Sequence, residues 1–214
     1  MNSDASDTDD LLRQAAGGDS AALAELFSRY RRRLRQMVRL RLDRRLQGRV
    51  DPSDVLQEAY IDLAQQLPAY LARPEMPFFL WLRLLTGQRL MRLHRQHLGA
   101  AMRDAGREVS LYRGALPQAS TTSLAAQLLG RFTSASEAAI RAERQLLLQG
   151  ALNALDPLDR EIIALRHFEE LTNQEAAAVL GLSKSAASNR HVRALTRLQA
   201  MLEGIPGFLD RHRK

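Results

Sequence analysis

The sequence contains no cysteine, which excludes disulfides and any metal or redox site built on thiolates. Long apolar runs are also missing: no stretch approaches the roughly 20 apolar residues that span a bilayer, so we expect no membrane insertion. The first ten residues are acidic and have no apolar core, which is unlike a signal peptide. We therefore expect a reduced, cytoplasmic protein.

Signals for β-strands are scarce as well. Aromatic residues make up 5% of the chain, β-branched residues are sparse, and apolar residues recur at intervals of three and four. This pattern predicts an all-α fold with two small helical domains joined by a flexible linker. We expect an acidic disordered tail over residues 1–10, a first domain over 11–98, the linker over 99–133, a second domain over 134–204 and a tail over 205–214.

The motifs of common enzymes are absent from the sequence. There is no glycine-rich phosphate loop and no nucleophile motif, and the five histidines form no convincing set of metal ligands. His94 and His97 are three residues apart on a basic segment, where we expect them to be solvated or to face phosphate. We therefore predict a protein without enzymatic activity, metal or cofactor.

Lysine is almost absent too, with 2 residues against 29 arginines, while the net charge is +7. Such a charge favours a polyanionic partner, and arginine suits bidentate contacts with phosphate and guanine. A GC-rich genome would produce the same arginine bias, and we weigh the two explanations about equally. Residues 29–49 carry ten arginines against Asp43 alone, which favours contact with DNA or a protein partner over simple solvation.

The most informative stretch runs from Leu155 to Leu202. Thr172 and Glu175 form a capping box that begins a short alanine-rich helix ending at Leu180. Gly181 supplies a turn, and Ser183 is the N-cap of a second helix. This arrangement predicts a helix-turn-helix whose second helix presents its N-terminal end to the major groove.

The second helix of this motif is the predicted recognition helix. Ser188 and Asn189 occupy positions suited to base edges, whereas its arginines suit phosphates, and His191 suits packing. The candidates for DNA binding are Lys184, Ser185, Ser188, Asn189, Arg190, Arg193 and Arg197.

Two helices in the chain begin with the same pattern. Asp51-Pro52-Ser53-Asp54 places an aspartate at the N-cap, proline at the first helical position and an acid in the first turn. Asp156-Pro157-Leu158-Asp159 repeats it and leads into a helix predicted over 158–168. Further helices are predicted from Ser20, over 78–98 and near 124–129, with an irregular proline-bounded loop over 68–77 and a capping box over 134–137.

Taken together, the motifs resemble those of the extracytoplasmic-function sigma factors of bacterial RNA polymerase. Leu155, Pro157, Arg160, Glu161 and Ile162, followed by the helix-turn-helix, are similar to domain four of that family. Upstream, residues 54–60 (DVLQEAY) resemble the conserved core of domain two, and residues 78–82 (FFLWL) resemble its Phe-x-x-Trp-Leu helix. The resemblance covers roughly residues 11–202.

The resemblance implies a promoter-specificity subunit that reads a duplex minus-35 element and a melted minus-10 element. It would bind the clamp helices and the flap of the large subunits of core RNA polymerase, with an anti-sigma factor or another regulatory complex left open as a further partner. An acidic face in a basic protein suits a basic protein partner better than DNA, although it could also be an ordinary solvated face. The polymerase-binding candidates are Asp54, Gln57, Glu58 and Asp62.

The same resemblance assigns minus-10 recognition to the proline-bounded loop and to the helix after it. Tyr70 and Arg73 could stack on or contact an extruded base, although Tyr70 could equally cover the core. Trp81 suits the core. The helix contributes Gln88, Arg92 and Arg95; Gln88 stands where the family commonly has Asn, and Arg92 where it has Asp, which weakens any transfer of base specificity.

A second hypothesis is a conventional helix-turn-helix regulator that acts without polymerase and carries an N-terminal sensing domain. No pocket-like or phosphorylation-like signature upstream supports it. Stoichiometric association with core polymerase separates the two, because only the sigma factor requires it.

Overall fold

The computed structural model describes residues 3–98, 116–132 and 138–204, and in these ranges it contains helices but no strand. The chain divides into two compact units, residues 1–38 with 42–116 and residues 39–41 with 117–214. The predicted all-α fold with two helical domains is confirmed. The predicted capping box over 134–137 and the tail over 205–214 lie outside the described residues.

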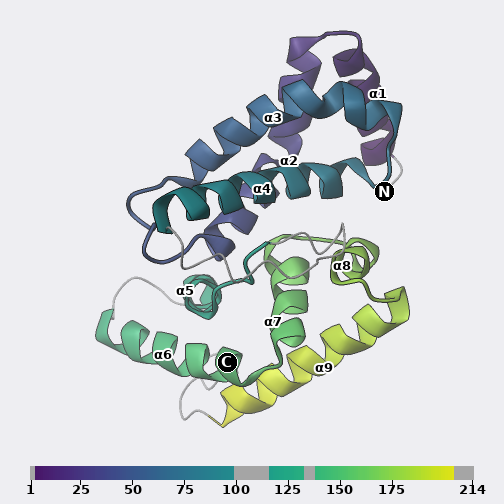
Figure 1. The fold of residues 1–214 in the computed structure, drawn as a ribbon. Coiled ribbons are helices and arrows are strands. Elements are labelled where there is room, and N and C mark those ends of the chain that lie inside the picture. The colour runs from purple at the N-terminus through teal and green to yellow at the C-terminus, as the bar shows by residue number, and fades with distance from the viewer. Residues whose placement is uncertain (1–2, 99–115, 133–137, 205–214) are drawn as a thin grey trace. The chain divides into compact units, whose positions relative to one another are not determined.

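The described residues of the first unit form α1 (Ser3–Ala16), α2 (Ser20–Arg41, whose last three residues group with the second unit), α3 (Pro52–Ala72) and α4 (Phe78–Leu98) (Figure 1). Asp19 caps α2 by accepting hydrogen bonds from the amides of Ala21 and Ala22, as the expected start near Ser20 requires. The core is formed by fully buried side chains of α2, α3 and α4, among them Leu26, Leu34, Leu56, Leu63, Leu82 and Leu90. Burying one such side chain stabilises the fold by about 1.5–3 kcal/mol relative to leaving it exposed.

Two predictions for the first unit are wrong. Residues 3–10, expected as a disordered tail, belong to α1. Acidic side chains near the N-terminus of a helix stabilise it through their interaction with the helix dipole. The hydroxyls of Thr8 and Tyr30 lie 3.3 Å apart and link α1 to α2. The loop expected over 68–77 is shorter, because α3 continues through Pro68 to Ala72. Pro68 removes one backbone hydrogen bond of α3, and the burial of Leu63 and Leu67 of the same helix offsets this loss.

The second unit contains α5 (Thr121–Phe132), α6 (Ala138–Ala154), α7 (Pro157–Ile163), α8 (Asn173–Leu180) and α9 (Lys184–Glu203). Between α7 and α8 the chain widens into a π-helical turn, η2 (Ala164–Phe168), so the helix predicted over 158–168 is not a regular α-helix throughout. Phe168 of η2 and Leu148 and Leu152 of α6 fill the core. Ala176, Ala187 and Ala194 are fully buried, which lets α8 and α9 pack closely against their neighbours.

The predicted boundaries of the linker require a correction. The short helix expected near 124–129 exists as α5, but it packs against α6 and belongs to the second unit. Leu124 and Ala125 are fully buried there. The second unit therefore begins at Pro117 rather than at residue 134. Residues 99–115 of the predicted linker lie outside the described residues.

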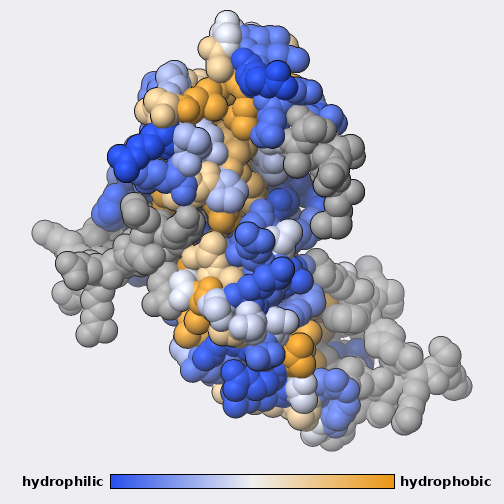
Figure 2. Space-filling model, turned by 90° about the vertical axis from the view of Figure 1, so that its right-hand side faces the viewer, coloured by the Kyte–Doolittle hydropathy of each residue, from blue (hydrophilic) through white to orange (hydrophobic). Residues whose placement is uncertain are grey.

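On the face that Figure 2 presents, hydrophilic side chains of the described residues surround patches of hydrophobic ones. Large hydrophobic side chains are exposed at Ile61 on α3, at Leu146 and Leu147 on α6 and at Val192 on α9. None of the helices in the described ranges is both long and apolar enough to cross a membrane.

Candidate nucleic-acid and protein interfaces

The helix-turn-helix is held in place by the caps that the sequence predicts. The Thr172 hydroxyl accepts a hydrogen bond from the Glu175 amide, and the Glu175 carboxylate accepts one from the Thr172 amide. Gly181 ends α8 in the left-handed region at φ 63°, a conformation that favours glycine. Ser183 then caps α9 by accepting from the Ala186 amide. These contacts fix where the recognition helix begins.

The N-terminal part of α9 carries a polar exposed face. Lys184, Ser185, Ser188 and Asn189 are all exposed, as base-reading side chains must be before DNA binds. The Asn173 side chain donates a hydrogen bond of 2.8 Å to the Lys184 carbonyl, which links the first turn of α8 to the first turn of α9. The angle between the two helices is therefore fixed next to the candidate reading residues.

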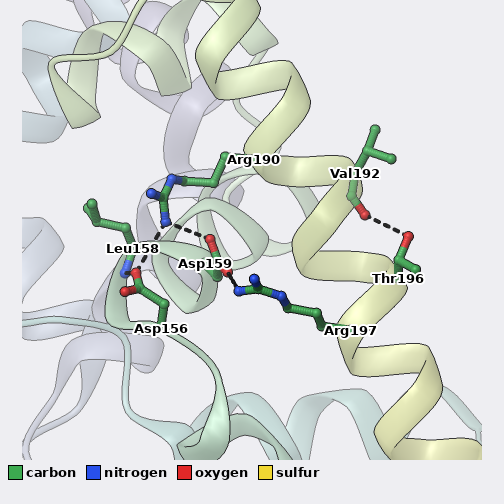
Figure 3. Close-up of polar contacts among 7 residues, drawn as sticks. All are labelled: Asp156, Leu158, Asp159, Arg190, Val192, Thr196 and Arg197. Carbon is green, nitrogen blue, oxygen red and sulfur yellow. Dashed lines mark hydrogen bonds and ion pairs between the residues drawn. The ribbon is translucent and has the colours of Figure 1, made fainter.

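Arg190 and Arg197, which the sequence predicts as phosphate contacts, both have an acidic partner within the second unit. Both guanidinium groups bind Asp159 of α7, whose side chain is 4% exposed: Arg190 Nη1 lies 2.6 Å from Oδ1, and Arg197 Nη1 lies 3.1 Å from Oδ2 (Figure 3). Arg190 also reaches Asp156 at 3.2 Å. Within the unit these arginines hold α9 against α7, because a buried carboxylate needs a cationic partner.

Arg193 and Val192 occupy the exposed side of α9. Arg193 is exposed, as a phosphate contact requires. Val192 is 59% exposed and follows Ser188 and Asn189 by four and three residues, so the three share one helix face. An exposed valine next to polar side chains suits a thymine methyl group.

His191 of α9 packs against His167 of η2, in agreement with the packing role that the sequence predicts. Its Nε2 lies 2.8 Å from Nε2 of His167, and the ring centroids are 5.0 Å apart. Partial burial, followed by the neighbouring His167 and Arg166, lowers the pKa of His191. The neutral ring therefore attaches α9 to η2.

In the first unit, Gln88, Arg92 and Arg95 come together on one face of α4. Gln88 and Arg95 are exposed, Arg92 is half-exposed, and all three line a cavity of about 300 Å³. They follow one another at intervals of four and three residues, which brings them to the same side of a helix. These three predicted minus-10 residues thus form one cluster.

Tyr70 and Arg73 do not share a loop. Tyr70 lies in the last turn of α3, stacked on Trp81 with ring centroids 4.4 Å apart, and its hydroxyl donates to the Met76 carbonyl at 2.9 Å. Burial raises the pKa of Tyr70. These contacts favour the packing role over base capture. Arg73 is exposed and pairs with Glu75 at 3.1 Å.

The acidic face of α3 divides into an exposed part and a buried part. Asp54, Gln57 and Glu58 are exposed, and Glu58 also pairs with Arg89 at 3.2 Å. Asp62, predicted to bind polymerase, is buried instead. Its side chain is 5% exposed and accepts hydrogen bonds from Nε and Nη2 of Arg89 on α4. It joins two helices of the unit and is not available to a partner.

Two further expectations concern basic residues of the first unit. His94 is not solvated: it is 1% exposed and its Nε2 accepts a hydrogen bond of 3.2 Å from the Asp43 amide, whereas His97 is exposed. Burial lowers the pKa of His94. Part of the arginine run is used internally, since the Arg33 guanidinium lies 3.5 Å above the Phe79 ring.

Comparison with known proteins connects these surfaces to a family. The family described as "Sigma-70, region 4" matches residues 151–200. The "RNA polymerase sigma-E factor" of Streptomyces antibioticus is 40% identical over 62 residues, 29% of this chain and 34% of that protein. The protein of that name from Streptomyces coelicolor is 39% identical over 61 residues. The chain spans about a third of the length of these relatives.

A solved structure extends the similarity over both units. The chain of CnrH, in its complex with the cytosolic domain of CnrY, is 26% identical with a TM-score of 0.52. The match covers 91% of this chain and 96% of that one. Residues 151–200 therefore match region 4 of the sigma-70 family, and the chain as a whole is similar in fold to CnrH. The region-4 match contains the helix-turn-helix and all seven candidate residues of the recognition helix.

Sequence reasoning missed three exposed or half-exposed residues that belong with the candidate sites. Ile61 follows Glu58 by three residues on α3, and Val192 follows Asn189 by three on α9; helical spacing could have found both. Leu116 lines the α4 cavity from a segment outside that helix, and no spacing rule connects the two.

Proposed function

We propose that this sigma factor binds core RNA polymerase and directs it to promoters with a duplex minus-35 element and a melted minus-10 element. The acidic surface of α3, defined as Asp54, Gln57, Glu58 and Ile61, would bind the clamp helices. Helix α9 would read the duplex, and the α4 face would contact the melted strand. Polymerase and promoter would place the protein in the cytoplasm.

The observation that carries the proposal is the acidic surface itself. In a chain of net charge +7, three neighbouring positions of α3 present two carboxylates and an amide to solvent, with an exposed isoleucine beside them. An apolar side chain within a ring of polar groups is typical of the centre of a protein interface. DNA would be repelled by this surface, whereas a basic protein partner would fit it.

The candidate reading surfaces support the division between duplex and single strand. The exposed face of α9 offers short polar side chains and one valine, which suits base edges in a major groove. The α4 face offers two guanidinium groups and an amide around a cavity, which suits unpaired bases and their phosphates. The flap of polymerase and an anti-sigma factor stay further proposed partners.

A gel-shift experiment with and without core polymerase tests this function. We expect the full-length protein alone to bind promoter duplex weakly, because few side chains of α9 face the groove. Adding core polymerase should produce promoter-specific complexes and permanganate-reactive thymines in the melted region. Tight operator binding by the protein alone, unchanged by polymerase, would support the polymerase-independent regulator instead.

A further inference from the structure

A set of ion pairs joins the acidic surface of α3 to the basic face of α4. The buried Asp62 side chain accepts hydrogen bonds from Nε and Nη2 of Arg89. The third nitrogen of the same guanidinium group, Nη1, lies 3.2 Å from Oε2 of Glu58. On the other side, Nη2 of Arg92 lies 3.8 Å from Oδ2 of Asp62. We call Glu58, Arg89, Asp62 and Arg92 the α3–α4 ion network.

The contacts within this network differ in strength. Arg89 binds Asp62 through two charge-assisted hydrogen bonds, the strongest geometry between arginine and a carboxylate. Arg92 is beyond hydrogen-bond distance from Asp62 and its side chain is 42% exposed, so this ion pair is the weaker one. Arg92 is therefore the member of the network that a second anion removes most easily from Asp62.

The charges of the network balance one another, because two carboxylates face two guanidinium groups. Both acids act on Arg89, whose pKa is raised by the hydrogen bond to Asp62 and also by the charge of Glu58. An outside cation that pairs with Glu58 leaves the full charge of Arg89 to act on Asp62 and to repel Arg92. Such effects are strong here because Asp62 is shielded from water.

We propose that the α3–α4 ion network couples polymerase docking on α3 to strand binding on α4, with Arg89 and Asp62 as positioning residues. A basic group of polymerase pairs with Glu58, and Arg92 is released from Asp62 to a phosphate of the melted strand. This inference rests on the proposed function, which assigns the two partners to these two helices. It depends on arginine at position 92, where the family that the sequence resembles commonly has aspartate.

The affinity of the free protein for a single strand tests this coupling. A fluorescent single strand from the minus-10 region of a promoter that the polymerase complex opens is titrated with the full-length protein, and anisotropy gives the dissociation constant. Glu58→Gln imitates the docked state, because it removes the charge that polymerase would neutralise. We expect about fivefold tighter binding of the strand, at the low end for coupling between two sites. Combined with Arg92→Gln, the same change should give no gain.

Glu25→Gln is a matched control for the loss of one negative charge. Glu25 and Glu58 are 58% and 56% exposed, and Glu25 also pairs with an arginine, Arg29, at 3.4 Å. It lies on α2 and belongs to a different ion pair. We expect strand affinity within about a factor of two of the wild type, because salt screens exposed charges away from the contact. A gain equal to that of Glu58→Gln would reduce the effect to net charge and overturn the coupling.

Arg89→Lys breaks the connection between the two acids. Lysine keeps a cation beside the buried Asp62, but it lacks the planar fork that binds both carboxylates. Glu58→Gln should therefore add no gain to Arg89→Lys. Because coupling is reciprocal, saturating strand should raise the affinity of the wild type for core polymerase about fivefold and leave that of Arg89→Lys unchanged.

Thermal melting separates this positioning role from a purely structural one. A structural Arg89 would lower the melting temperature of Arg89→Lys and leave the gain from Glu58→Gln intact, which would overturn the coupling. If Arg89→Lys does not fold, the combination of Glu58→Gln with Arg92→Gln decides, since Arg92 is not buried.

Distinct results separate this inference from the proposed function. If the wild-type protein does not bind the strand even with core polymerase, both are overturned. If it binds, but Glu58→Gln leaves the strand affinity of the free protein unchanged or keeps its gain without Arg92, only the coupling is overturned. A gain from Glu58→Gln that disappears in both Arg92→Gln and Arg89→Lys supports it.

Discussion

The two Asp-Pro-x-Asp helix starts allow a comparison of the two units. Asp51 and Asp156 do the same work: each is an N-cap whose carboxylate accepts from the amide two residues on, at 2.7 and 2.8 Å. The acids three residues later differ. Asp54 is exposed, whereas Asp159 is buried and binds two arginines of α9.

This difference shows what a local pattern can specify. A capping motif determines where a helix begins, because its hydrogen bonds are made within three residues. It does not determine what the next acid contacts, because that depends on a helix about thirty residues further along the chain. The first unit has its own buried acid, Asp62, so each unit joins a basic helix to an acidic one.

The largest effect should come from Asp159. Asp159→Ala leaves Arg190 without its buried partner, and we expect a loss of about 3 kcal/mol in the free energy of unfolding, at the low end for broken buried ion pairs because Arg197 is more than half exposed. Asp54→Ala should cost less than about 1 kcal/mol. Urea denaturation measures both. Equal losses in the two variants would mean that the exposure of the two acids does not govern stability.

The next effect distinguishes the side chains of α9 that contact base edges from those that contact phosphates. Ser188→Ala or Asn189→Ala should change the ranking of minus-35 sequences by about 1–3 kcal/mol. Arg193→Ala should weaken all sequences alike and reduce the salt slope by about one. Competition gel-shifts of the polymerase complex at several salt concentrations measure this.

Arg190→Ala is the informative contrast on the same helix. Because its guanidinium is bound by Asp159, we expect lower stability of the protein with little change in the salt slope. If Arg190→Ala reduced the salt slope by about one without lowering stability, Arg190 would be a phosphate contact after all.

The N-caps should behave alike, in contrast to the acids that follow them. Asp51→Ala and Asp156→Ala should each lower the free energy of unfolding by about 1 kcal/mol, the typical cost of losing a cap. Asp156→Asn and Asp51→Asn should recover most of this loss, since asparagine also caps helices. A much larger loss for Asp156→Ala alone would show that its contact with Arg190 dominates over capping.

The smallest effect concerns pH and the buried histidine of the first unit. Burial lowers the pKa of His94 below the ordinary value of 6.5, so the unfolded chain binds the proton more readily. His94 therefore contributes stability that is complete above about pH 6.5 and is lost as the pH falls below it. Thermal melting at pH 7.5 and 5.5 should show a smaller acid-induced drop for His94→Gln than for the wild type. An equal drop would place the sensitivity elsewhere.

Much of the fold could be predicted, for a physical reason. Caps, prolines and the period of apolar residues are local signals, and they correctly predicted the helix-turn-helix, the start of α2 and both aspartate-capped starts. Helix α1 was missed because its few apolar residues suggested disorder, and Pro68 was assigned to a loop because proline usually ends a helix.

The candidate sites were harder to predict, because exposure depends on tertiary partners. Asp62, His94 and Arg190 have the same chemistry as exposed residues nearby, and only the packing of another helix or turn against them makes them internal. Leu116 can pack against α4 because Gly87 has no side chain, and no sequence motif predicts this contact. The exposed reading residues of α9 and the α4 cluster, by contrast, follow from helical spacing.

The most direct test of polymerase docking is the affinity of labelled sigma factor for core polymerase after charge reversal on α3. Asp54→Lys should weaken binding about a hundredfold, because a like charge at an interface costs several kcal/mol. Glu25→Lys, an exposed reversal on α2, should bind as the wild type does, and both variants should keep their helical content. Wild-type affinity for Asp54→Lys, alone and with Glu58→Lys, would contradict docking through the acidic surface of α3.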